Sequence, residues 1–163
     1  MKRIISVLME NQPGALSRVV GLFSQRGYNI DNLNVAPTND LSLSRLTLTT
    51  VCDDYTIEQI TKQLNKLIDV VKVLDISNGP HIERELMLIK VRARDENRAE
   101  VKRCVDIFRG KIIDVGANYY TVVVEGDAQK LDGFIAAMGD IKVLEVARSG
   151  ICGIARSEKA MSI

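Results

Sequence analysis

The same succession of short apolar segments occurs twice in this chain of 163 residues, and this repetition constrains the fold most. In the first copy, residues 4–9 alternate like a half-buried strand, and Leu16, Val19, Val20 and Phe23 have the spacing of one helix face. Four segments complete this copy: β-rich 29–36 and 43–52, a helical stripe over 57–67, and a strand at 70–76. Their order predicts a βαββαβ unit.

The second copy begins after the turn sequence Ser77-Asn78-Gly79-Pro80. Its segments, in order, are a strand at 87–91, a helix at 101–108, strands at 112–115 and 119–125, a helix at 131–138 and a strand at 141–146. Gly27 and Gly110 are expected to end the first helix of each copy. We predict an α+β chain of two tandem ferredoxin-like βαββαβ domains, residues 1–77 and 78–163. A short tail follows from Arg148.

Composition excludes several classes of protein. With 22 Lys and Arg against 21 Asp and Glu, the formal charge is +1, which argues against a nucleic-acid partner. The strand over 41–51 also lacks the aromatic residues that stack RNA bases. No apolar run is long enough to span a bilayer, and residues 4–9 are too short for a secretory signal. The expected location is cytoplasmic.

The sequence contains no recognisable catalytic or metal-binding constellation. Its three cysteines are far apart and there is one histidine, so neither a zinc site nor a disulfide framework is expected. No phosphate-cradling loop is present, and we expect no catalytic residue and no bound metal. Domains of about 75 residues leave much apolar surface uncovered, which predicts self-association.

The segment ENQPGALSR, residues 10–18, joins the first strand to the first helix. Pro13-Gly14 is compatible with a plain turn. It is also compatible with an anion site, because the N–H groups of Gly14, Ala15 and Leu16 are unpaired at a helix start. Asn11 adds an amide that suits an ammonium group. No Arg or acidic cluster is expected here for a phosphate or a bound metal, so an amino acid is the best-fitting ligand.

Residues 10–38, ENQPGALSRVVGLFSQRGYNIDNLNVAPT, resemble the opening of the small regulatory subunit of acetolactate synthase (acetohydroxyacid synthase). The resemblance continues through SRLTLTT, EQITKQLNKLIDVVKV, ERELMLIKV, FRGKIIDV and EVARSG, and so covers nearly the whole chain. It is similar in particular to the valine-sensitive bacterial isozyme III form. The resemblance implies that the first half is an ACT domain and the second a related ferredoxin-like domain.

The resemblance also implies a function. Such a subunit binds and activates a catalytic large subunit, which carries thiamine diphosphate, Mg²⁺ and FAD, and makes it sensitive to valine. None of these cofactors is expected on this chain. The implied effector site joins two paired ACT domains: Asn11, Gly14, Ala15 and Leu16 from one chain, Asn29 and Ile30 from the other, with Ser17 and Ala36 as supporting positions.

Some alternatives stay open at this point. A stand-alone amino-acid-sensing ACT protein that regulates another enzyme fits the same pattern, and Asn29 also suits a simple turn. The ending SEKAMSI departs from the family, so the tail 148–163 receives no role. The preference among valine, leucine and isoleucine, the surface that contacts the catalytic subunit and the stoichiometry are also left open. The second half is expected to contribute mainly to partner contact and activation. A fragment ending near Gly79 is therefore expected to dimerise and to bind valine weakly, but to activate poorly.

Overall fold

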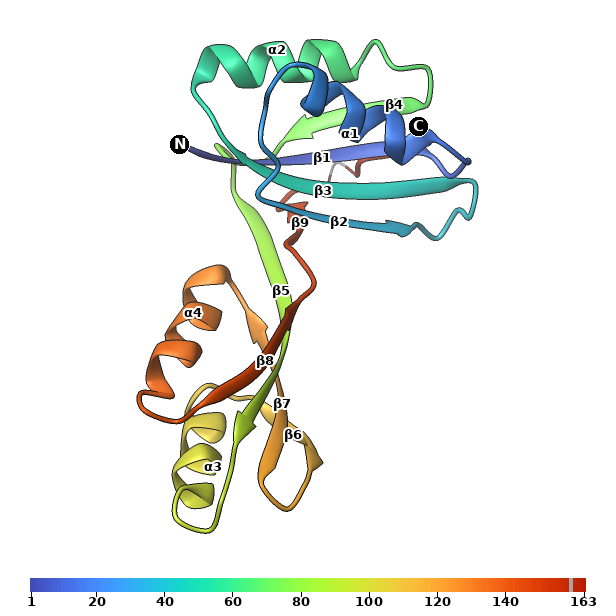
Figure 1. The fold of residues 1–163 in the computed structure, drawn as a ribbon. Coiled ribbons are helices and arrows are strands. Elements are labelled where there is room, and N and C mark those ends of the chain that lie inside the picture. The colour runs from blue at the N-terminus through green and yellow to red at the C-terminus, as the bar shows by residue number, and fades with distance from the viewer. Residues whose placement is uncertain (159) are drawn as a thin grey trace. The chain divides into compact units, whose positions relative to one another are not determined.

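A computed structural model describes residues 1–158 and 160–163, which form two compact units (Figure 1). The first unit is Met1–Ile82 together with Ile151–Ile163, and the second is Glu83–Gly150. Each unit has an antiparallel sheet and two helices in the order βαββαβ. The predicted α+β fold of two ferredoxin-like units is confirmed. The first unit is discontinuous, because the chain returns to it after completing the second.

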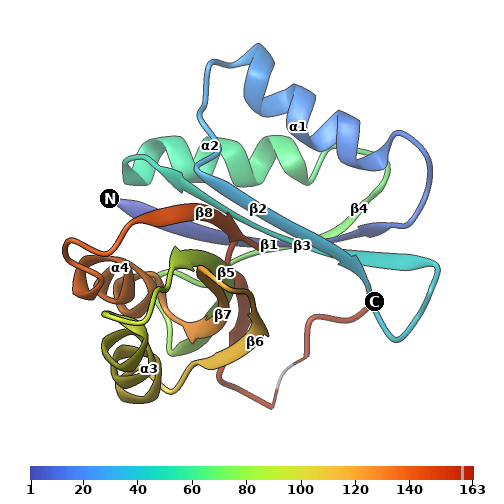
Figure 2. The same cartoon turned by 60° about the horizontal axis from the view of Figure 1, so that its bottom comes forward.

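The first unit has the strand order β2-β3-β1-β4. Its elements are β1 (Lys2–Glu10), α1 (Ala15–Gln25), β2 (Asn32–Pro37), β3 (Leu43–Val51), α2 (Asp54–Leu64), β4 (Val70–Asp75) and β9 (Cys152–Ala155). Both helices cover one face of the sheet, as Figure 2 shows. Ile5, Val7 and Met9 of β1 face these helices, so the alternation of the first strand determines which face is buried against them.

The second unit repeats the arrangement with the strand order β6-β7-β5-β8. Its elements are β5 (His81–Arg92), α3 (Arg98–Ile107), β6 (Lys111–Val115), β7 (Tyr119–Gly126), α4 (Ala128–Ala137) and β8 (Val143–Arg148). Met87, Ile89 and Val91 of β5 face α3 and α4, as their counterparts do in β1. The rings of Phe108 and Phe134 meet edge to face in this core, with centroids 5.4 Å apart.

The ends of the helices follow local chemistry. Asp53 accepts a hydrogen bond from Thr56 N at 2.7 Å and thereby caps the start of α2. Gly27 ends α1 with a φ of 69°, and Tyr28 N donates to Phe23 O at 2.9 Å. This is the Schellman arrangement, which confirms the predicted role of Gly27.

Gly110 differs from its prediction. The left-handed position after α3 belongs to Arg109, with a φ of 55°, while Gly110 N donates to Val105 O at 2.8 Å. A Cβ on Gly110 would lie 2.9 Å from Val123 O. The glycine is therefore required by the close approach of β7 and not by the backbone conformation of the cap.

Residues 151–156, which we call the strap, cross the face of the first sheet that the helices leave open. Arg45 Nη2 donates to Gly153 O at 2.8 Å, and Ile151 N donates to Asn32 Oδ1 at 3.1 Å. A Cβ on Gly153 would lie 2.7 Å from Ile76 Cδ1, and Ile151 is buried. We expected this segment to belong to the short tail of the second domain. The structure instead groups residues 151–163 with the first unit, and β9 pairs with β5.

Each unit buries one charged side chain at the same position of its first strand. Arg3, 2 % exposed, donates to Asn78 Oδ1 at 3.0 Å and pairs with Asp54 and Asp75. In the second unit, Glu85, 5 % exposed, accepts two hydrogen bonds from Arg148 at 3.0 and 2.9 Å.

No helix in the described part of the chain is long and apolar enough to cross a membrane.

Candidate functional site

The start of α1 is left-handed at Gly14, where φ is 86° and no side chain caps the helix. Within the described residues, the N–H groups of Gly14 and Leu16 have no hydrogen-bond partner. Ala15 N differs from the prediction, because it donates to Gln12 O at 3.2 Å. Two of the three expected donors therefore face a possible anion, and the third closes the turn.

Asn11 is fixed against the loop that precedes β3. Its backbone N donates to Ser42 O at 2.8 Å, and its Nδ2 donates to Leu41 O at 3.0 Å. Nδ2 is thus occupied, and no donor within the described chain reaches Oδ1. The side chain is therefore oriented, with its acceptor oxygen left for another group.

Arg18 is the residue of this site that sequence reasoning missed. Its Nη1 lies 2.9 Å from the point where a Cβ on Gly14 would stand, and its Nε donates to Asp69. The side chain of Asp69 is 8 % exposed, and its hydrogen bond raises the pKa of Arg18. We considered only clusters of Arg or acidic residues at the helix start, and so did not single out one guanidinium. The signal was the i, i+4 spacing from Gly14 to Arg18.

Asn29 and Ile30 lie after the opposite end of α1. Asn29 Nδ2 donates to Asp31 Oδ1 at 2.8 Å, and Thr50 Oγ1 donates to Asn29 O at 2.6 Å. Ile30 is half-buried against the core. A helix of 11 residues separates these positions from Gly14, a length of about 16 Å. One chain therefore does not bring the two groups together.

The remaining predicted positions divide between the two faces of the sheet. Ala15 is buried and Leu16 is half-buried against the core, while Ser17 is exposed on α1. Ala36 lies on β2, paired with Arg45, on the open face of the sheet. There it lines a pocket of about 630 Å³ together with Asn34, Arg45, Thr47 and residues 161–163.

Among the described residues, no three His, Cys, Asp or Glu side chains gather where they could hold a metal ion. What this site offers is a partly positive helix start, an oriented amide oxygen and a guanidinium held by a buried carboxylate. These groups suit the carboxylate and ammonium of a small zwitterion.

Comparison with known proteins decides the family. A family model described as "Small subunit of acetolactate synthase" matches residues 84–157, and one described as "AHAS small subunit-like ACT domain" matches residues 5–72. The chain belongs to the family of acetolactate synthase small subunits. Acetolactate synthase isozyme 3 small subunits from Salmonella typhimurium and Escherichia coli are each 56 % identical to it over 162 residues, covering 99 % of both chains.

A solved structure of the same family agrees in fold. The crystal structure of the acetolactate synthase small subunit from Thermotoga maritima superposes with a TM-score of 0.90 at 41 % identity. The match covers 98 % of this chain and 99 % of that one. The first unit is accordingly the ACT unit of an acetolactate synthase small subunit.

Proposed function

We propose that this chain is the non-catalytic regulatory subunit of an acetolactate synthase and acts in the cytoplasm. It activates a catalytic large subunit, which holds thiamine diphosphate, Mg²⁺ and FAD, and it lowers the activity of that subunit when valine binds. The observation that carries the proposal is the 56 % identity to isozyme 3 small subunits over 99 % of both chains.

The start of α1 supports valine as the effector. The carboxylate of the ligand accepts hydrogen bonds from Gly14 N and Leu16 N, next to the guanidinium of Arg18. The ammonium group donates to Asn11 Oδ1, and the apolar side chain of valine contacts Leu16.

The second half of the effector site comes from a paired chain in this proposal. Asn29 and Ile30 are too far along α1 to contact a ligand bound at Gly14 of the same chain, whereas a neighbouring first unit supplies them. Strand β2 lies at the edge of its sheet and leaves Val35 37 % exposed, so it is available for such pairing. We therefore assign effector binding and dimerisation to the first unit.

The test is a synthase assay with the cognate catalytic subunit, with and without this chain, across a series of amino acids. We expect stimulation of pyruvate turnover by the full chain, and inhibition of the stimulated activity by valine. An unchanged rate of the catalytic subunit, with valine nevertheless bound to the chain, would favour an amino-acid sensor that regulates a different enzyme.

A further inference from the structure

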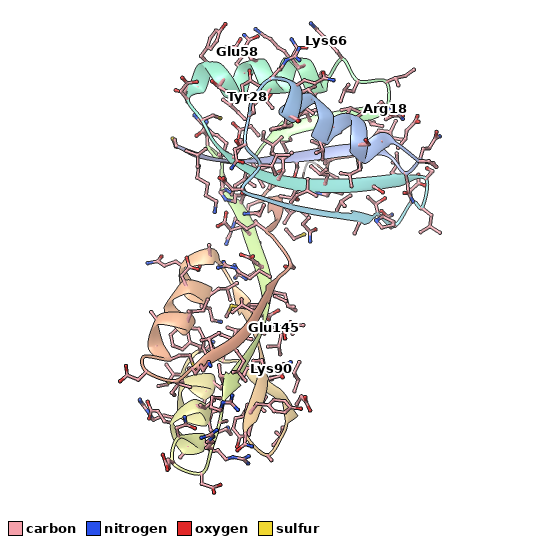
Figure 3. All side chains as sticks on the ribbon, viewed as in Figure 1. Arg18, Tyr28, Glu58, Lys66, Lys90 and Glu145 are labelled. Carbon is pink, nitrogen blue, oxygen red and sulfur yellow. The ribbon has the colours of Figure 1, made fainter. Side chains whose placement is uncertain are left out.

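A groove of about 500 Å³ lies between α1 and α2 of the first unit. Arg18 and Lys66 both line it, and Figure 3 shows Arg18 on α1 and Lys66 in the turn that follows α2. Leu22 and Leu67 give it an apolar part, and cations and amides line much of the rest. The residues that matter below are Arg18, Gly21, Leu22, Arg26, Lys66 and Leu67.

The charge of this groove is positive and uncompensated. Arg18 is neutralised by Asp69, but Arg26 and Lys66 are exposed and have no ion pair within the described chain. The other cations of these helices differ in this respect, because Lys62 pairs with Glu58 at 2.6 Å. The groove therefore presents two free positive charges beside the apolar part formed by Leu22 and Leu67.

Gly21 keeps one wall of the groove bare. It lies inside α1, where glycine is less stabilising than alanine. A Cβ built on Gly21 meets no atom within 4 Å, so packing within this chain does not require the glycine. The missing side chain instead lets another chain approach the helix backbone closely.

We propose that this groove is the docking site for an acidic segment of the catalytic large subunit, an assignment that rests on the proposed function. Carboxylates of the segment pair with Arg26 and Lys66, and its apolar side chains pack on Leu22 and Leu67 beside Gly21.

The same features disfavour other occupants. A symmetric contact with a second copy would bring two cationic grooves face to face. Nucleic acids and anionic lipid surfaces are bound by larger clusters of basic residues than this pair. The polar side chains around the groove are exposed or half-buried, so they form no enclosed cage for a small anion.

The first test measures the affinity of the full chain for the cognate catalytic subunit by calorimetry at two salt concentrations. Arg26→Glu combined with Lys66→Glu is expected to raise Kd at least about tenfold at low salt and to flatten its salt dependence. Lys72→Glu is the matched control, because Lys72 is exposed on β4 and does not line the groove. Its affinity should stay near that of the parent, and valine should bind every variant equally.

Gly21→Ala provides a second test, because it should stabilise the free chain and weaken its complex with the catalytic subunit. The free chain should melt about 2 °C higher, because the helix gains alanine. The complex should be weaker by about tenfold, because the added methyl group blocks the close approach.

The outcomes separate the two proposals. A parent chain that does not bind the catalytic subunit overturns the proposed function and this inference together. A parent that binds, with unchanged affinity in both the charge-reversed and the Gly21→Ala variants, overturns only the docking site. A charge-reversed variant that changes dimer sedimentation without changing the affinity for the catalytic subunit also overturns it.

Discussion

The two units have the same topology, but the loops that join their first strand to their first helix carry different charged residues. In the first unit the loop contains no acidic residue between Asn11 and Gly14, and the helix start is bare. In the second, Asn97 Oδ1 accepts from Arg94 N at 2.9 Å, and Asp95 and Glu96 add two carboxylates. The first helix start thus has no carboxylate in its loop, whereas the second has two, beside the cations Arg94 and Arg98. The same fold therefore places different charges at its two helix starts.

A second difference lies in the buried ion pairs. Arg3 of β1 and Glu85 of β5 occupy equivalent positions, and their partners Asp75 and Arg148 are also equivalent, opposite Ile5 and Met87 respectively. The sign of each charge is reversed between the units. The position therefore requires a matched pair, whichever strand carries the cation.

Arg148→Met should have the largest effect on stability, because it leaves the buried Glu85 without its cation. The hydrogen bonds with Glu85 raise the pKa of Arg148, so the pair favours the charged form of the guanidinium. We expect a loss of about 3 kcal/mol of unfolding free energy by urea titration. The double variant Glu85→Leu, Arg148→Met should recover most of it. A single variant as stable as the parent would mean that the pair contributes nothing.

Deletion of residues 151–163 should have the next largest effect, because it makes the open face of the first sheet as bare as that of the second. The loss of buried Ile151 and the exposure of Ile4 and Ile76 should cost about 2 kcal/mol in urea unfolding. Deletion of residues 157–163 alone, which keeps the strap, is the control and should cost much less. Equal losses from both deletions would contradict a stabilising role for the strap.

Gly14→Asp gives the first loop the acidic character of the second. The new carboxylate pairs with Arg18 and repels the carboxylate of valine, so calorimetry should show binding at least about tenfold weaker than in Gly14→Ala. Both variants have the same positive φ, so each should lose about 1 kcal/mol in thermal unfolding. Equal valine affinity in the two variants would place the carboxylate of the ligand elsewhere.

The smallest effect concerns pH and the cap of α2. Hydrogen bonds from Thr56 lower the pKa of Asp53 below its ordinary value. This contribution to stability is fully present above about pH 5 and is lost as the pH falls through the lowered folded-state pKa. Asp53→Asn keeps the cap without the charge. Urea midpoints of parent and variant, which differ at neutral pH, should converge near pH 3, and a constant difference would exclude this titration.

The helices and central strands could be predicted because their apolar periodicity is local. Leu16 to Phe23 shows a buried helix face without reference to any other segment. The strap could not be predicted in this way. Its strand β9 is four residues long and pairs with β5, and the strap is bound by Asn32 and Arg45, more than a hundred positions away. The expected fragment ending near Gly79 lacks the strap, and we now expect it to expose Ile4 and Ile76.

The candidate site, like the fold, could be predicted only in part. The helix start followed from Pro13-Gly14, whereas Arg18 depended on a side-chain direction that the sequence does not determine. The position of Gly110 shows the same limit, because its requirement comes from a carbonyl of β7 that approaches it in space.

The return of the chain to its first sheet also affects how the protein is made. Residues 1–82 leave the ribosome long before residues 151–156. The sheet face beside Ile4 and Ile76 therefore stays exposed to solvent during most of translation. The second unit, Glu83–Gly150, is continuous and can close as soon as it has emerged. The first unit is thus begun first and finished last, and a nascent chain completes it only after the strap has been synthesised.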